Sequence, residues 1–217
     1  MKFLNAADGV KKIFTAEILS LFATIFLVIA TLFGVVTVAG ISVDSADGFF
    51  VSVAGAAVFG LASVVLFVIA YILNLVGVNK AAKDEPAFKI ALYAIIIGLI
   101  ITVVSSFLPS NASFRNVIQI ISDIANLVIT LYVVQGIRNL AVKLDNSEMD
   151  KKGESIFKVM ICIYALIIIA KVITAIVSNN VTVTISLVLI IIAGILNVVQ
   201  YILYLIYLNK AKKMLAE

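Results

Sequence analysis

Stretches of 25 or more consecutive uncharged residues recur along the chain. There are four of them, with 26, 32, 25 and 38 residues, at positions 18–43, 48–79, 90–114 and 172–209. A helix needs only about 20 apolar residues to cross the hydrocarbon core of a bilayer. The chain is 64% hydrophobic and 13% charged, whereas soluble domains are about 45–50% apolar and about 25% charged. This excess of apolar residues indicates an integral membrane protein.

Charges and turn-forming residues divide the chain into six predicted helices, at about 18–40, 50–78, 87–108, 115–140, 156–178 and 183–208. The two prolines, Pro86 and Pro109, both fall between these helices. The strands of a membrane barrel would alternate apolar and polar residues, but the apolar runs here are continuous. The sequence therefore predicts an all-α protein, in which residues 1–217 form a single six-helix transmembrane bundle.

The basic residues predict how the bundle is oriented. Of the 16 lysines and arginines, 14 lie in the two terminal segments and in the second-to-third and fourth-to-fifth connections. Positively charged segments face the cytoplasm, so both termini are expected there, in a multi-pass protein of the cell membrane. These charges favour anionic lipid headgroups by about 1 kcal/mol each when close to the surface. A second copy of the chain or a membrane partner is possible, and nucleic acid is not expected.

Residues 1–17 precede the first predicted span. They combine apolar residues such as Val10 and Phe14 with the basic residues Lys2, Lys11 and Lys12. This pattern predicts a short amphipathic helix on the cytoplasmic face. Alternatively, the segment is a basic leader that only sets the topology.

The even-numbered helices end in similar sequences. Each ends in an asparagine with a lysine four positions later: Asn79 and Lys83, Asn139 and Lys143, Asn209 and Lys213. The odd-numbered helices begin alike, at Lys12-Ile13, Lys89-Ile90 and Lys158-Val159. A period near 70 residues predicts three parallel helical-hairpin repeats. Independent convergence of lysine-rich helix ends is the alternative.

Two neighbouring helices carry small residues four positions apart. On the second helix these are Gly48, Ser52, Ala56 and Gly60, and on the third they are Ala94, Gly98, Thr102 and Ser106. Small side chains let helix backbones approach closely within a membrane. Both stripes are therefore predicted helix-packing faces, either within the chain or between protomers.

Polar residues recur at helical spacing on the last three helices. Asp123 on the fourth helix and Lys171 on the fifth are expected at similar depth, because a short connection makes these helices antiparallel neighbours. An unpaired charge at the bilayer centre costs about 2.5–3.5 kcal/mol, so we predict an ion pair between them. With further residues the pair defines a predicted polar track: Asp123, Lys171, Asn126, Thr130, Asn197, Gln200 and Tyr204.

The sequence offers little catalytic chemistry. It contains no histidine and one cysteine, Cys162, which excludes histidine-based triads, zinc sites of histidine and cysteine, and disulfides within the chain. Phosphate-binding loops and hydrolase motifs are absent. We therefore expect neither an enzyme nor a bound cofactor or metal. The acidic residues of the basic connections, including Asp84 and Glu85, are expected to form a solvated surface.

The polar track has two functional interpretations. Ionisable groups within a membrane typically mark solute or ion pathways, which predicts a small transport or channel-like module. Alternatively, the same residues form interhelical hydrogen bonds that fix helix register, in a non-catalytic membrane subunit or scaffold. A lipid-interacting protein is a further alternative, and it would need a lateral opening between helices.

Overall fold

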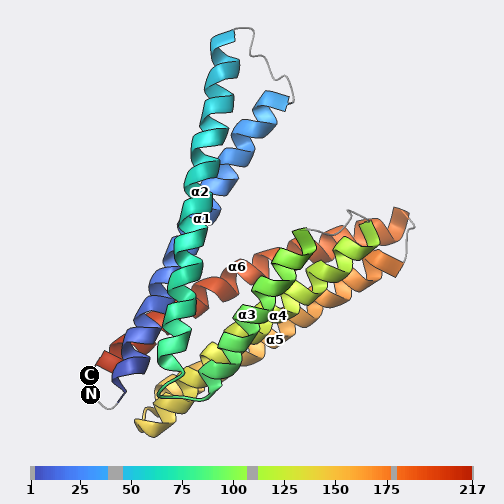
Figure 1. Cartoon of the computed structure of the whole chain (residues 1–217). Helices are drawn as coiled ribbons and strands as arrows, with labels where there is room; N and C mark the ends of the chain where they lie inside the picture. Colours follow the sequence, from blue (N-terminus) through green and yellow to red (C-terminus); the bar gives the residue numbers. More distant parts are fainter. Residues whose placement is uncertain (1–2, 39–45, 107–111, 177–179, 217) are drawn as a thin grey trace. The chain divides into compact units, whose positions relative to one another are not determined.

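The computed structural model describes residues 3–38, 46–106, 112–176 and 180–216, and within them the chain forms six α-helices and no strand (Figure 1). These helices are α1 (Leu4–Val38), α2 (Ala46–Ala81), α3 (Ala87–Ser106), α4 (Ala112–Lys143), α5 (Ser147–Ile176) and α6 (Asn180–Ala216). Each predicted helix falls on one of them. The prediction of an all-α fold with six helices is therefore confirmed.

Several helices have the length and composition of membrane spans. Within the described residues, four segments are long and apolar enough to cross a bilayer: Leu4–Val35, Val51–Ala81, Ala87–Ser105 and Ile120–Lys143. Large apolar side chains lie on their outer surfaces, and Leu61 and Val58 are 69% and 64% exposed. Continuous apolar surfaces of this kind are typical of contact with lipid. The fold is therefore that of a membrane protein.

The chain divides into two compact units. One unit is Lys12–Gly77, which contains most of α1 and α2. The other combines Met1–Lys11 with Val78–Glu217, and so contains the first turns of α1, the end of α2 and all of α3 to α6.

Aromatic side chains join α1 to α2 within the unit Lys12–Gly77. The Phe59 ring stacks on Phe33, with centroids 5.9 Å apart, and meets Phe26 edge to face at 5.7 Å. Such pairs contribute about 0.5–1.5 kcal/mol beyond the burial of their area. A Cβ atom at Gly55 would lie 3.1 Å from the Phe33 ring. The glycine therefore leaves room for this ring.

In the larger unit α3 packs on α4, α4 on α5 and α5 on α6 (Figure 1). A short reversal joins α4 to α5. Asp145 adopts a φ of 55°, and the Asn146 amide donates to the Ala141 carbonyl at 2.9 Å. These are the features of a Schellman C-cap. The Asn146 side chain then accepts a hydrogen bond from the Met149 amide at 3.1 Å and caps α5. The contact between α4 and α5 thus follows from this short connection, as the sequence predicted.

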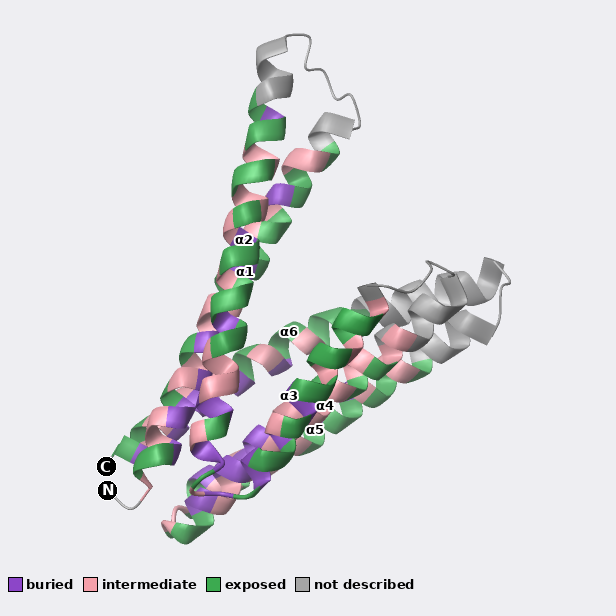
Figure 2. Ribbon diagram, viewed as in Figure 1, coloured by how far each residue is buried: buried purple, intermediate pink, exposed green. Residues whose placement is uncertain are grey.

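The buried side chains of the larger unit gather at the ends of the helices near the α2–α3 and α4–α5 connections (Figure 2). Phe88, Ile137, Leu140 and Leu208 are fully buried there. The Phe88 ring lies against Gly136, where a Cβ atom would be only 2.5 Å from the ring. This close packing holds the start of α3 against the end of α4 and positions the polar groups around them.

The observed helix ends extend beyond several predicted ones. The helix α1 begins at Leu4, so it includes most of the segment predicted as a separate leader. The helix α5 begins at Ser147 and carries Glu148 and Asp150 in its first turn. Acidic side chains stabilise the positive end of the helix dipole, so these charged residues extend the helix rather than forming a loop.

Candidate functional site

A buried carboxylate lies in the α2–α3 connection. The Glu85 side chain is only 5% exposed. Its Oε1 accepts a hydrogen bond from Asn139 Nδ2 at 2.8 Å, and its Oε2 accepts one from Lys143 Nζ at 2.6 Å. Asn139 is itself held by Gln135, whose Nε2 donates to Asn139 Oδ1 at 2.8 Å. The prediction that Glu85 belongs to a solvated surface is therefore wrong, because its charge is buried and compensated by these partners.

Burial and hydrogen bonding shift the pKa of Glu85 in opposite directions. Burial raises this pKa because it disfavours the charged form, whereas the hydrogen bonds from Lys143 and Asn139 lower it. The hydrogen bonds prevail, and the pKa lies below its ordinary value. The stabilisation is accordingly present above the ordinary carboxyl pKa, and it is lost as the pH falls through the folded-state pKa.

Acidic side chains also bind the start of α1 at this end of the larger unit. Asp84 Oδ2 accepts a hydrogen bond from the Ala6 amide at 2.8 Å, and Asp84 Oδ1 accepts one from Asn5 Nδ2 at 3.0 Å. The first amides of a helix have no partner within it, so Asp84 satisfies one of them from outside. Asp8 pairs with Lys80 at 2.5 Å. The N-terminal turns are thus bound to the end of α2 and to the α2–α3 connection.

The acids of these two ion pairs occupy equivalent positions in the predicted repeat, but their lysine partners do not, because Lys80 directly follows Asn79 whereas Lys143 lies four residues after Asn139. Asp8 and Glu85 each stand four residues before the lysine of the repeated start motif, which is Lys12 for Asp8 and Lys89 for Glu85. Each pairs with a lysine at the end of the following even-numbered helix, Lys80 for Asp8 and Lys143 for Glu85. Glu154 is the equivalent residue in the last hairpin, but it lies near Arg138 and Lys158 instead.

A second polar cluster lies where the end of α4 meets the start of α5. Arg138 Nε donates to Asp150 Oδ1 at 2.9 Å, and Arg138 Nη2 lies 3.9 Å from Glu154 Oε2. Tyr207 of α6 reaches this cluster because residue 153 is glycine. A Cβ atom at Gly153 would lie 2.4 Å from both the Tyr207 hydroxyl and Arg138 Cγ.

The buried face of α6 carries a polar stripe that ends at this cluster. Its members, Gln200, Tyr204 and Tyr207, are 5%, 3% and 2% exposed and lie four and three residues apart. In the part of the chain that the structure describes, neither Gln200 Oε1 nor the Tyr207 hydroxyl has a hydrogen-bond partner. A buried polar atom left unpaired costs about 1–3 kcal/mol. The stripe therefore offers two unfilled hydrogen-bonding positions inside the unit.

The predicted polar track maps onto three helices of the larger unit. Gln200 and Tyr204 of the track belong to the α6 stripe, and Asn197 is half-buried one turn before them. Sequence reasoning missed Tyr207, Arg138 and Asp150, because a tyrosine and charges near helix ends are typical of the membrane interface.

On α4 the polar residues of the track differ in exposure. Asp123 is half-buried and Asn126 is exposed. The Thr130 hydroxyl donates to the Asn126 carbonyl of its own helix at 2.9 Å. Lys171 belongs to α5, but its side chain lies outside the described residues. The ion pair between Asp123 and Lys171 therefore stays a prediction.

The first residues of the small-residue stripe on α3 pack inside the larger unit. Ala94 is buried, and a Cβ atom at Gly98 would lie 3.9 Å from Ala125 Cβ of α4. The Thr102 hydroxyl donates to the Gly98 carbonyl at 2.9 Å, and the Ser106 side chain lies outside the described residues. The role of this stripe in packing stays a prediction.

The residues of the small-residue stripe on α2 differ in how closely they are packed. Ser52 is buried and Ala56 is half-buried, but no atom lies within 4 Å of a Cβ built at Gly60. Gly48 lies in α2 outside the residues whose surroundings are described. The closely packed glycine of α2 is Gly55, which does not belong to the predicted stripe. The packing role of this stripe also stays a prediction.

No protein-family profile, curated protein or solved structure matches the chain. Among the described residues, no group of three histidine, cysteine or acidic side chains could hold a metal ion. The chain is an all-helical membrane protein with an ion-paired network at one end of its larger unit.

Proposed function

We propose that the chain is a six-span protein of the cell membrane, with both termini in the cytoplasm, that forms a small solute or ion transport or channel-like module. The distribution of basic residues supports this orientation. The helices α5 and α6 have 30 and 37 residues, more than the roughly 20 that a span needs. The clusters around Glu85 and Arg138 then lie at the cytoplasmic interface.

The α6 stripe is the observation that carries the transport proposal. Gln200 Oε1 and the Tyr207 hydroxyl are buried and unpaired within the described part of the chain. Inside a membrane such atoms favour the binding of water or a polar solute, because an unpaired buried polar atom costs free energy. The stripe ends at the Arg138–Asp150 pair, so it supplies the inner half of a polar route. Asp123, Lys171 and the rest of the track supply the outer half in this proposal.

A non-catalytic membrane subunit or scaffold is the second candidate. The network around Glu85 favours it, because Asn139 and Lys143 satisfy the carboxylate as a purely structural clamp would. Thr130 likewise bonds to its own helix. In this alternative the α6 stripe fixes helix register, and the partner is a second copy or another membrane protein. Neither candidate is an enzyme.

The substitution Gln200→Leu separates the two candidates. Leucine fills a similar volume and removes the unpaired amide oxygen, so thermal stability should be unchanged or higher. In liposomes that contain the purified protein, fluorescence and light-scattering assays measure the flux of protons, potassium, chloride and glycerol. For the transported species we expect a fall of at least about tenfold, which corresponds to about 1.4 kcal/mol of lost stabilisation along the route.

Ile202→Leu is the matched control, because Ile202 lies on the exposed face of the same helix and is 52% exposed. Its flux should equal that of the unmodified protein. A scaffold would give no flux above protein-free liposomes, whether or not Gln200 is replaced. That result would contradict the transport proposal and favour the second candidate.

A further inference from the structure

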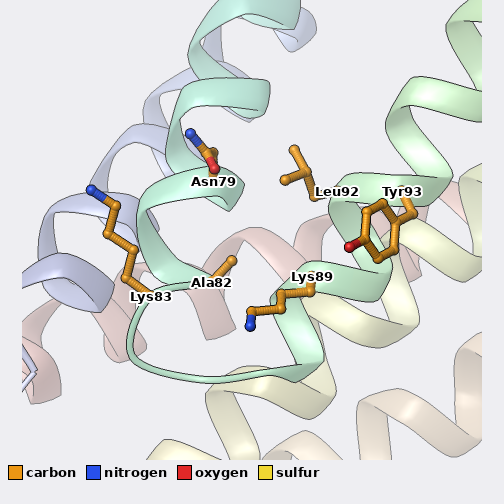
Figure 3. Close-up of a pocket in the computed structure, with 6 residues that line it drawn as sticks. All are labelled: Asn79, Ala82, Lys83, Lys89, Leu92 and Tyr93. Atoms are coloured by element: carbon orange, nitrogen blue, oxygen red, sulfur yellow. The ribbon is translucent and has the colours of Figure 1, made fainter.

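A pocket of about 470 Å³ lies between the end of α2 and the start of α3 (Figure 3). Its size is within the range of about 300–1,000 Å³ that is typical of small-molecule sites. The Lys89 ammonium and the Tyr93 hydroxyl point into the space between the two helices, whereas the Lys83 ammonium extends outward along α2 (Figure 3). The lining consists of Asn79, Ala82, Lys83, Lys89, Leu92 and Tyr93.

The lining is cationic, and its charges are not neutralised nearby. In the described part of the chain, neither Lys83 nor Lys89 has an acidic partner, although Lys80 and Lys143 do. The nearest acids along the chain are already engaged, because Asp84 bonds to the first turn of α1 and Glu85 bonds to Lys143. Two lysines with amide and phenol donors suit a phosphate group, whose oxygens accept charge-assisted hydrogen bonds.

The position of the pocket indicates where such a phosphate comes from. One candidate span ends at Ala81 and the next begins at Ala87, so the pocket lies where both helices leave the apolar region. The headgroups of a bilayer lie at this level. Tyr93, which lines the pocket, is 61% exposed, and Ile90, which follows Lys89 in the chain, is 43% exposed. They present an apolar surface that acyl chains can cover.

We propose that this pocket binds the phosphate group of an anionic phospholipid. Lys89 and Lys83 supply the positive charges, and Lys83 has a long flexible stem that lets it turn toward the ligand. The Asn79 amide and the Tyr93 hydroxyl donate hydrogen bonds. The site is separate from the α6 stripe and does not require transport. Only the leaflet that holds the lipid rests on the proposed topology.

Native mass spectrometry tests this site on the full-length protein in nanodiscs of phosphatidylcholine doped with phosphatidylglycerol. The protein should retain phosphatidylglycerol in preference to phosphatidylcholine. In the double variant Lys83→Gln with Lys89→Gln, we expect the affinity for phosphatidylglycerol to fall at least about tenfold, since each lysine near a headgroup contributes about fivefold. The double variant Lys151→Gln with Lys213→Gln removes the same net charge from two exposed lysines elsewhere. It should retain the lipid.

Equal losses in both double variants would reveal only a general attraction between basic surface and anionic lipid, and would overturn the pocket. Tyr93→Phe keeps every charge and changes an exposed side chain, so it tests the site even if the double variant fails to fold. It should weaken retention about threefold through the lost hydrogen bond, and unchanged retention would count against the proposal.

Inorganic phosphate identifies the source of the phosphate group. If it displaces phosphatidylglycerol and binds the detergent-solubilised protein equally well, the pocket belongs to a soluble anion and the lipid assignment is overturned. Both leaflets of the nanodisc carry phosphatidylglycerol, so the outcome does not depend on which face is cytoplasmic. A failure of lipid binding therefore leaves the transport proposal untouched.

Discussion

Replacement of Glu85 by alanine is expected to lower the free energy of unfolding by about 2–3 kcal/mol. The buried carboxylate accepts hydrogen bonds from Asn139 and Lys143, and both donors lose their acceptor. Breaking a fully buried pair costs about 3–5 kcal/mol. Here the loss is smaller because Lys143 is 46% exposed and regains contact with water. Denaturant unfolding of the purified protein in detergent micelles measures the difference.

The matched control for this prediction is Glu148→Ala. Glu148 pairs with Lys152 one turn later, but its side chain is 75% exposed. Exposed ion pairs contribute little to stability because water and salt screen them, so this variant should unfold like the unmodified protein. Equal losses in the two variants would contradict the burial of the Glu85 carboxylate.

The substitution Gly136→Ala is expected to destabilise the protein by about 1–3 kcal/mol through overpacking. The added methyl group would lie 2.5 Å from Phe88 Cε2 and 2.8 Å from two further ring atoms. Phe88 is fully buried, so its ring cannot turn aside and α3 must move away from α4. Phe88→Leu in the Gly136→Ala background should recover part of the loss, because it shortens the obstructing side chain.

The same substitution at Gly194 provides the control. No atom lies within 4 Å of a Cβ built at this glycine of α6. Alanine has the higher helix propensity, so Gly194→Ala should be neutral or slightly stabilising. If Gly136→Ala proves as stable as Gly194→Ala, the described packing of Phe88 against α4 is incorrect. Unfolding in micelles, as for Glu85, gives both values.

The number and order of the helices could be predicted because helices that cross lipid require long uncharged stretches. The start of α5 could not be placed in this way, since charges such as Glu148 and Lys151 resemble a loop when only apolar runs are counted. The sequence nevertheless indicates a helix here. Glu148 with Lys152 and Glu154 with Lys158 have the four-residue spacing of helical ion pairs. Outside the bilayer a helix carries its charges on exposed faces.

The burial of Glu85 could not be predicted from the sequence. Its partners Asn139 and Lys143 lie 54 and 58 residues away, and their approach depends on which helix ends meet. The predicted repeat gives a partial indication. Asp8 and Glu85 each lie four residues before the lysine of the start motif. The repeat therefore places an acidic residue at the same position in both hairpins. The spacing alone does not reveal that one of these acids is buried and the other half-exposed.

A water-filled route along α6 is tested most directly by cysteine accessibility. Cys162 is the one cysteine of the chain, so Cys162→Ser gives a background in which Gln200→Cys or Ile202→Cys is the only thiol. A membrane-impermeant thiol reagent added to the cytoplasmic side of sealed vesicles reports contact with water, because the reactive thiolate does not form in lipid. Modification at position 200 at least about tenfold faster than at position 202 is the result we expect. Equal protection of both cysteines would indicate a dry bundle and contradict the route.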